Sequence, residues 1–133
     1  AILHGGGHNH RFSLSDAILI KDNHIAAAGG IKQVLEAVQR NVGHMVVVEI
    51  EIDGLHQLDE VLQTGGADVI MFDNMSTEDM AEAVKRIDGR AKTEASGNVT
   101  LGRLREIASV NVDYISSGAL THSAGTVDFG LDF

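Results

Sequence analysis

Short apolar segments recur along this chain at nearly constant intervals. Glu49, Met71, Glu94 and Ile115 occupy comparable places in four of these segments and lie 22, 23 and 21 residues apart. This interval is the length of one strand followed by one helix with short connections. Successive units of this kind form a parallel sheet, either open or closed into a barrel. We therefore expect residues 1–133 to form one α/β domain or one piece of such a domain.

The positions of the elements follow from hydrophobic period and from capping residues. Helices are expected where apolar residues recur with the helical period, over residues 30–41, 55–64, 77–87 and 101–110. Asp53, Ser76 and Thr100 are the expected N-caps, and Ser76 with Asp79 has the spacing of a capping box. The expected strands cover residues 1–3, 17–21, 45–52, 68–72, 91–95, 113–116 and 127–131.

The length limits how much of a barrel the chain can form. A complete eightfold barrel takes roughly 200 to 250 residues, whereas this chain has 133. The sequence also opens on Ala1, Ile2 and Leu3, an apolar start without methionine. We interpret it as a chain cut from something longer at its N-terminal end.

Composition excludes several classes of protein. The formal net charge of −9 argues against non-specific binding to duplex nucleic acid, which needs a positive surface. The absence of cysteine excludes disulfides, thiolate metal sites and a cysteine nucleophile. No apolar stretch is long enough for a membrane span, and no signal peptide is visible, so a cytoplasmic location is expected.

Polar residues gather where the expected strands end. Lys21, Asp73 and Ser96 each stand at such an end, and in parallel α/β folds these ends form the active-site rim. Gly97 and Gly118 lie in small-residue turns after neighbouring strands, where backbone N–H groups can approach a phosphate. The alternative is that these turns need glycine for steric reasons alone.

Acidic residues on the third expected strand indicate a ligand or a metal. Glu49 and Glu51 are two apart and point to the same side of the strand. Together with Asp73 they could hold Mg²⁺ or ribose hydroxyls, because buried carboxylates need such partners. One of the two glutamates is expected to be structural and to pair with a basic residue.

The segment from Gly5 to Arg11 is unusual but matches no general motif. It lacks the Lys-Ser/Thr ending of a phosphate-binding loop, and His8 and His10 have no third zinc ligand at a recognisable spacing. Arg11 and Lys21 are suited to binding carboxylates, with a surface salt bridge as the alternative for each.

Five strings, in order along the whole chain, resemble the quinolinate phosphoribosyltransferase family, also called carboxylating nicotinate-nucleotide pyrophosphorylase. They are GGGHNHRFSLSDAILIKDNHI (5–25), VVEIEIDGLHQLDEVL (47–62), DVIMFDNM (68–75), TEASGNVT (93–100) and VDYISSGALTHS (112–123). The resemblance covers about the C-terminal half of such a protein. It implies that the fold is the C-terminal portion of a TIM-like parallel α/β barrel.

The resemblance also implies a reaction and a site. Quinolinate and phosphoribosyl pyrophosphate would give nicotinate mononucleotide, pyrophosphate and CO₂, in NAD biosynthesis, with Mg²⁺ as cofactor and a homodimer or higher homo-oligomer as the assembly. Lys21, Glu51 and Asp73 match the catalytic positions, and Glu51 and Asp73 also the metal positions. The substrate-binding positions are His10, Arg11 and Lys21 for quinolinate, and Glu51, Asp73, Ser96, Gly97, Gly118, Ala119 and His122 for phosphoribosyl pyrophosphate.

Two other interpretations stay open at this point. One is a paralogous, molybdenum-associated enzyme on the same scaffold, against which the intact His10, Arg11 and Lys21 argue only in part. The other is a binding or assembly module without turnover. A partial barrel exposes an edge strand and part of its core, so we expect these 133 residues alone to be inactive and prone to associate.

Overall fold

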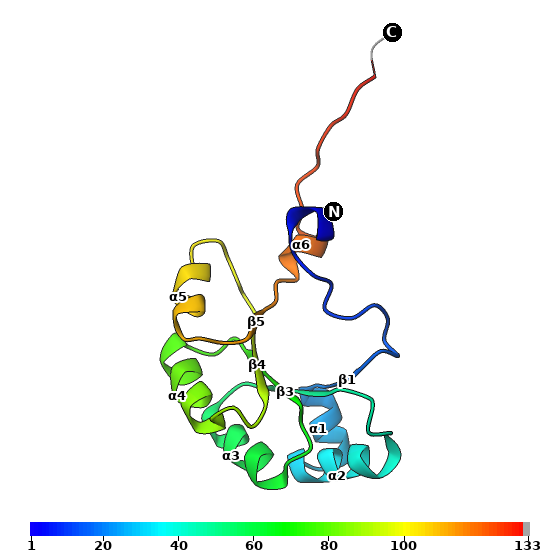
Figure 1. The fold of residues 1–133 in the computed structure, drawn as a ribbon, viewed down its shortest axis with the longest axis vertical. Helices are drawn as coiled ribbons and strands as arrows, with labels where there is room; N and C mark the ends of the chain where they lie inside the picture. The colour runs from blue at the N-terminus through cyan, green and yellow to red at the C-terminus, as the bar shows by residue number, and fades with distance from the viewer. Residues whose placement is uncertain (132–133) are drawn as a thin grey trace.

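The computed structural model describes residues 1–131 and contains one parallel sheet of five strands in the order β1-β2-β3-β4-β5. Each strand pairs in parallel with the strand that follows it in the chain. Figure 1 shows the larger helices as an outer arc around the strands, which is the arrangement of part of a barrel wall. The expected α/β fold, a portion of a parallel barrel, is confirmed.

The elements alternate along the chain as the spacing predicts. The strands are β1 (Ile18–Ile20), β2 (Val48–Ile52), β3 (Val69–Asp73), β4 (Lys92–Ser96) and β5 (Tyr114–Ile115). The helices are η1 (Leu3–Gly5, a 3₁₀ turn), α1 (Asp22–Ala28), α2 (Ile31–Asn41), α3 (Leu55–Thr64), α4 (Thr77–Ile87), α5 (Leu104–Ser109) and α6 (Ala119–His122). No helix among residues 1–131 has the length and apolar character needed to cross a bilayer.

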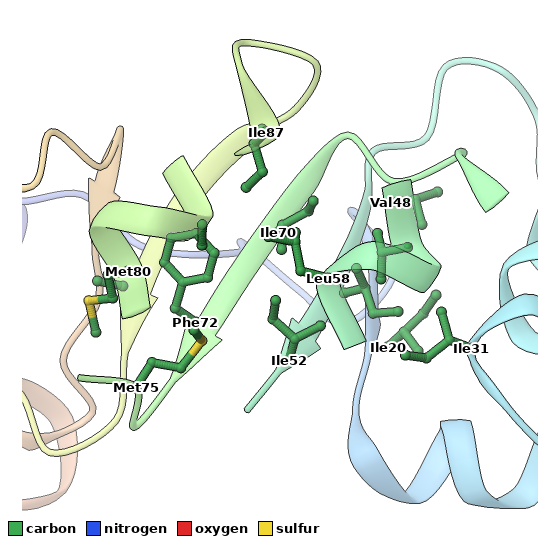
Figure 2. Close-up of a cluster of buried hydrophobic side chains, with 14 of the residues drawn as sticks. Ile20, Ile31, Val48, Ile52, Leu58, Ile70, Phe72, Met75, Met80 and Ile87 are labelled. Atoms are coloured by element: carbon green, nitrogen blue, oxygen red, sulfur yellow. The ribbon is translucent and has the colours of Figure 1, made fainter. Parts of the chain in front are cut away.

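The hydrophobic core lies between the outer face of the sheet and the helices. Ile50 and Phe72 come from the strands and are fully buried, as are Leu35, Leu58 and Ile107 from the helices. Figure 2 shows the side chains of Val48, Ile52, Ile70 and Phe72 beside those of Leu58, Met80 and Ile87. Because strand residues alternate in direction, the other face of the sheet carries Glu49, Glu51, Met71, Asp73 and Glu94.

Helix α4 shows how local sequence sets an element. Ser76 caps its N-terminus, since the Ser76 hydroxyl accepts a hydrogen bond from the backbone N–H of Asp79. Acidic residues occupy its first turn and basic residues its last, which complements the helix dipole. The Ser76 prediction is confirmed, whereas the caps expected at Asp53 and Thr100 are wrong. Helix α3 begins one residue later than a cap at Asp53 would place it, with Gly54 as its N-cap, and a turn over residues 101–103 separates Thr100 from α5, whose N-cap is Arg103.

Both strands expected at the chain ends are wrong. Residues 1–3 lead into the 3₁₀ turn η1, and Leu3 is largely exposed, with no strand beside it. Residues 127–131 contain no strand and extend away from the sheet (Figure 1). Val127 and Leu131 are exposed, so their apolar character here reflects neither burial nor strand pairing.

Two helices lie where sequence periodicity gave no signal. Helix α1 follows β1 directly, and the backbone N–H of Lys21 donates to His24 Nδ1 over 3.0 Å at its start. It has seven residues and α6 has four, too short for a helical period to be detected. Helix α1 places the Lys21 side chain at the carboxyl end of β1.

Candidate active site

A cavity of about 530 Å³ opens at the carboxyl ends of the strands. Every strand of the sheet, or the residues just after it, supplies part of the lining, and the segment before β1 supplies His10. The lining residues are His10, Leu19, Lys21, Glu51, Met71, Asp73, Glu94, Ser96, Gly97, Asn98, Val99, Thr100, Ser116, Ser117, Gly118, Ala119 and His122. The position agrees with the active-site face of α/β barrels.

Nine of the ten site residues expected from the sequence line this one cavity. The exception is Arg11, which is half-buried and whose guanidinium Nη1 donates to the carbonyl oxygen of Ala17 over 3.3 Å. Arg11 nevertheless lies close enough to Glu49 for its positive charge to favour the ionised form of that carboxyl. The functional roles of these residues remain predictions.

Lys21 and Glu51 form an ion pair at the cavity wall. Lys21 Nζ lies 3.3 Å from Glu51 Oε2, and the Lys21 side chain is 49% exposed while that of Glu51 is 16% exposed. Lys21 is the N-cap of helix α1, directly after β1, and Glu51 lies on β2, the strand that pairs with β1. The pair therefore presents one cation and one carboxylate side by side to a ligand in the cavity.

Two buried carboxylates, Glu49 and Glu94, meet below His10. His10 Nε2 lies 3.0 Å from Glu49 Oε2 and 3.3 Å from Glu94 Oε1. The Ser116 hydroxyl donates to Glu94 Oε1, whereas Glu49 Oε1 is buried without a partner among residues 1–131. Burial, the negative charge of Glu94 and the hydrogen bond between the two carboxyls raise the pKa of Glu49 to about 7.

Asp73 is held by a chain of side-chain amides. Asn74 Nδ2 donates to Asp73 Oδ2 over 2.9 Å, and Asn98 Nδ2 donates to Asn74 Oδ1 over 2.8 Å. Asn74 and Asn98 both adopt a left-handed backbone, with φ of 55° and 47°. Asparagine tolerates this conformation better than most residues, and such backbone strain is concentrated at functional sites.

The two glycine turns approach other groups closely. A Cβ at Gly97, where φ is +78°, would lie 2.5 Å from the Asn74 side chain. A Cβ at Gly118 would lie 3.1 Å from His122 Nε2. Glycine at these positions lets the two loops that follow β4 and β5 close around one end of the cavity.

Five polar residues at or after the predicted strand ends received no site role from the sequence, although all of them line the cavity: Glu94, Asn98, Thr100, Ser116 and Ser117. A signal for Glu94 exists, because strand register aligns Glu51 with Met71 and Met71 with Glu94. Residues aligned in this way point to the same face of the sheet. Counting back two residues from Ser96 at the end of β4 would have placed Glu94 in the cavity.

The arrangement combines groups for two kinds of anion. His10 and Lys21 come from the N-terminal part of the chain and are basic. The small-residue loops with Ser96 and Gly118 come later in the chain and offer hydroxyl and backbone donors. Glu51 and Asp73 stand between them in chain order and can bind hydroxyls or a cation. The cavity therefore combines cationic side chains, carboxylates, and hydroxyl and backbone donors.

Comparison with known proteins identifies sequences similar to this chain. The probable carboxylating nicotinate-nucleotide pyrophosphorylase of Bacillus subtilis is 46% identical over 132 residues, which are 99% of this chain and 45% of the relative. A quinolinate phosphoribosyltransferase [decarboxylating] of Nicotiana glauca is 43% identical over 148 aligned positions, with 98% and 42% covered. The chain thus spans less than half the length of these relatives.

Solved structures agree with the sequence comparison. The crystal structure of NadC from Streptococcus pyogenes matches with a TM-score of 0.88 and 42% identity, over 97% of this chain and 45% of that one. The nicotinate-nucleotide pyrophosphorylase of Ehrlichia chaffeensis matches with a TM-score of 0.84 and 39% identity, over 90% and 43%. The sequence profile of the quinolinate phosphoribosyl transferase C-terminal domain covers residues 1–132, and the chain belongs to that family.

Proposed function

We propose that the protein joins quinolinate to phosphoribosyl pyrophosphate, releasing pyrophosphate and CO₂ and forming nicotinate mononucleotide for NAD biosynthesis. One observation carries the proposal: apart from Arg11, the cations, carboxylates and small-residue loops expected for this reaction line a single cavity at the carboxyl ends of the strands. The relatives named for this activity support it. Under this proposal, the chain supplies the barrel side of the active site.

Quinolinate binding needs positive charge because the substrate is a dianion. Lys21 and His10 line the cavity, and Arg11 follows His10 directly. Lys21 can exchange its contact with Glu51 for a ligand carboxylate, since its side chain is only half-buried. We assign to these three residues the orientation of the pyridine ring and the neutralisation of its two carboxylates.

The sugar phosphate is assigned to the other groups of the cavity. Backbone N–H groups and hydroxyls around Ser96, Gly97 and Gly118 would hold the 5′-phosphate. Glu51 and Asp73 would lie by the ribose, where they can accept hydrogen bonds from its hydroxyls. Their negative charge also stabilises the positive charge that develops at the anomeric carbon as pyrophosphate departs.

The chemistry then follows from the ring nitrogen. Its lone pair forms the bond to the anomeric carbon while the bond to pyrophosphate breaks, which leaves the nitrogen positively charged. The adjacent carboxylate leaves as CO₂, and its bonding electron pair stays on the ring carbon, stabilised by that nitrogen, until a proton replaces it. This step needs orientation rather than a dedicated acid or base.

Magnesium is part of the proposal, and the donor set fits it. Mg²⁺ prefers oxygen ligands and is often held by one or two carboxylates together with substrate phosphates and water. Glu51 and Asp73 both offer carboxylate oxygens to the cavity, and Glu51 is already paired with a cation, Lys21. When bound there, Mg²⁺ would neutralise the charge of the pyrophosphate leaving group.

The test is an assay of the purified full-length protein with quinolinate and phosphoribosyl pyrophosphate, with nicotinate mononucleotide as the measured product. Formation of the product that depends on both substrates supports the proposal. Addition of a chelator should abolish it if Mg²⁺ is needed. Activity with nicotinic acid and none with quinolinate would overturn the substrate assignment.

A homo-oligomer and a cytoplasmic location belong to the same proposal. Light scattering on the purified full-length protein measures the assembly. A monomer at micromolar concentration would contradict it.

A further inference from the structure

Glu49 and Glu94 are the two buried acidic side chains of the sheet, and the proposed reaction uses neither. Each is 5% exposed, and they lie on β2 and β4, on the face of the sheet that lines the cavity. Buried negative charge below a pocket for a dianion opposes binding unless another group compensates it. The compensating group must therefore stand between these carboxylates and the ligand.

His10 occupies that place. Its Nε2 lies 3.0 Å from Glu49 Oε2 and 3.3 Å from Glu94 Oε1, and its side chain is 35% exposed at the cavity. An ionised carboxylate at Glu94 only accepts hydrogen bonds, so the ring hydrogen that points toward Glu94 Oε1 sits on Nε2. Nδ1 is then the ring nitrogen left for a ligand, and it donates only when the ring carries its second proton.

Ser116 fixes the position of Glu94. The Ser116 hydroxyl, just after β5, donates to Glu94 Oε1, the same oxygen that faces His10. The backbone N–H of Ser116 donates to the carbonyl oxygen of Ala95 over 2.9 Å, so Ser116 is itself anchored to β4. The orientation of Glu94, and through it that of His10, is thus set by the rigid part of the sheet.

We propose that Glu94, held by Ser116, and Glu49 are positioning residues that orient His10 so that its Nδ1 serves the dicarboxylate ligand. This inference rests on the proposed function, because it assigns the ligand of His10 to quinolinate. It explains why two acidic residues lie buried in the sheet of a pocket for anions. It also predicts that variants of Glu94 and Ser116 change KM for quinolinate but not for phosphoribosyl pyrophosphate, because the proposal assigns no contact between His10 and phosphoribosyl pyrophosphate.

The test measures KM for each substrate in the full-length protein. Glu94→Gln keeps the shape of the side chain but removes its charge, and should raise KM for quinolinate about tenfold, the size of one charge-assisted hydrogen bond. KM for phosphoribosyl pyrophosphate should stay within twofold. Ser116→Ala should act in the same direction but less strongly, and Ser116→Thr, which keeps the hydroxyl, should restore the KM. Glu78→Gln, on the exposed surface of α4, is the control.

A double-mutant cycle shows whether Glu94 acts through His10. In a His10→Ala background, Glu94→Gln should cause no further rise in KM for quinolinate. Equal effects on both substrates, additive effects with His10→Ala, or no rescue by Ser116→Thr would each overturn the inference. Wild-type protein that fails to make nicotinate mononucleotide would instead refute the proposed function, and with it the ligand assigned to His10. If Glu94→Gln does not fold, the Ser116 variants decide the question.

Discussion

The buried carboxyl of Glu49 makes the stability of the fold depend on pH in a direction opposite to that of ordinary surface carboxylates. Its pKa is raised from 4.5 to about 7, first by burial and then by Glu94. Below pH 4.5 the group is protonated in both the folded and the unfolded chain, and its contribution to stability is fully present. As the pH rises toward 7 the unfolded chain ionises first, so this contribution is lost by the time the pH passes the folded pKa.

The magnitude follows from the two pKa values. One pKa unit corresponds to about 1.4 kcal/mol, and a shift from 4.5 to about 7 gives a loss of about 2 kcal/mol between pH 5 and pH 8. Glu49→Gln replaces the carboxyl by a neutral group of the same shape and removes the titration. The free energy of unfolding of the variant, relative to wild type, should therefore increase by about 2 kcal/mol from pH 5 to pH 8.

The assay is urea unfolding of both proteins at the two pH values, in metal-free buffer at constant ionic strength. Comparing the two proteins at each pH cancels the titration of carboxylates remote from position 49. The charged or titratable groups that face Glu49 are Glu94, Arg11, Glu51 and His10, and the measured difference includes their coupling to it. Glu78→Gln, which also replaces a glutamate by glutamine, is the matched control, and its difference from wild type should be the same at pH 5 and pH 8. A difference between Glu49→Gln and wild type that is the same at pH 5 and pH 8, or that falls with pH, would refute the reasoning.

Three further predictions concern the packing around the site and the helices. Gly97→Ala places a Cβ 2.5 Å from Asn74, whereas Gly29→Ala, at a glycine that also has positive φ, places a Cβ with no atom within 4 Å. Gly97→Ala should therefore lower the free energy of unfolding by more than Gly29→Ala. Equal losses in urea unfolding would contradict this. Ser76→Ala should cost about 1 kcal/mol of unfolding free energy and Ser76→Asp nearly nothing, because only the alanine loses the cap of α4. Leu58→Ala removes a fully buried side chain and should cost about 2–5 kcal/mol, and a Tm unchanged from wild type would show that the site is not packed as described.

The central strands and long helices could be predicted because their signals are local and repeated. Helices α2, α3 and α4 each bury one face, which gives the helical period, and β2 and β3 are covered by helices on their outer face. The chain ends could not be predicted in this way. An apolar run such as Ala1 to Leu3 predicts a strand only if a partner strand exists, and pairing is a property of the whole sheet.

In the site, as in the fold, residues with a local sequence signal could be predicted, whereas residues placed by long-range contacts could not. Residues directly at strand ends, such as Lys21, Asp73 and Ser96, were found because topology alone brings these ends together. Glu94 received no role because its contacts depend on register across three strands and on His10, which reaches it from a segment before β1. Arg11 shows the reverse case: it follows His10 in the sequence, but its guanidinium is bonded to the Ala17 carbonyl rather than lining the cavity. Adjacent residues on an irregular segment can face different surroundings, so a contiguous motif predicts a shared region more securely than a shared contact.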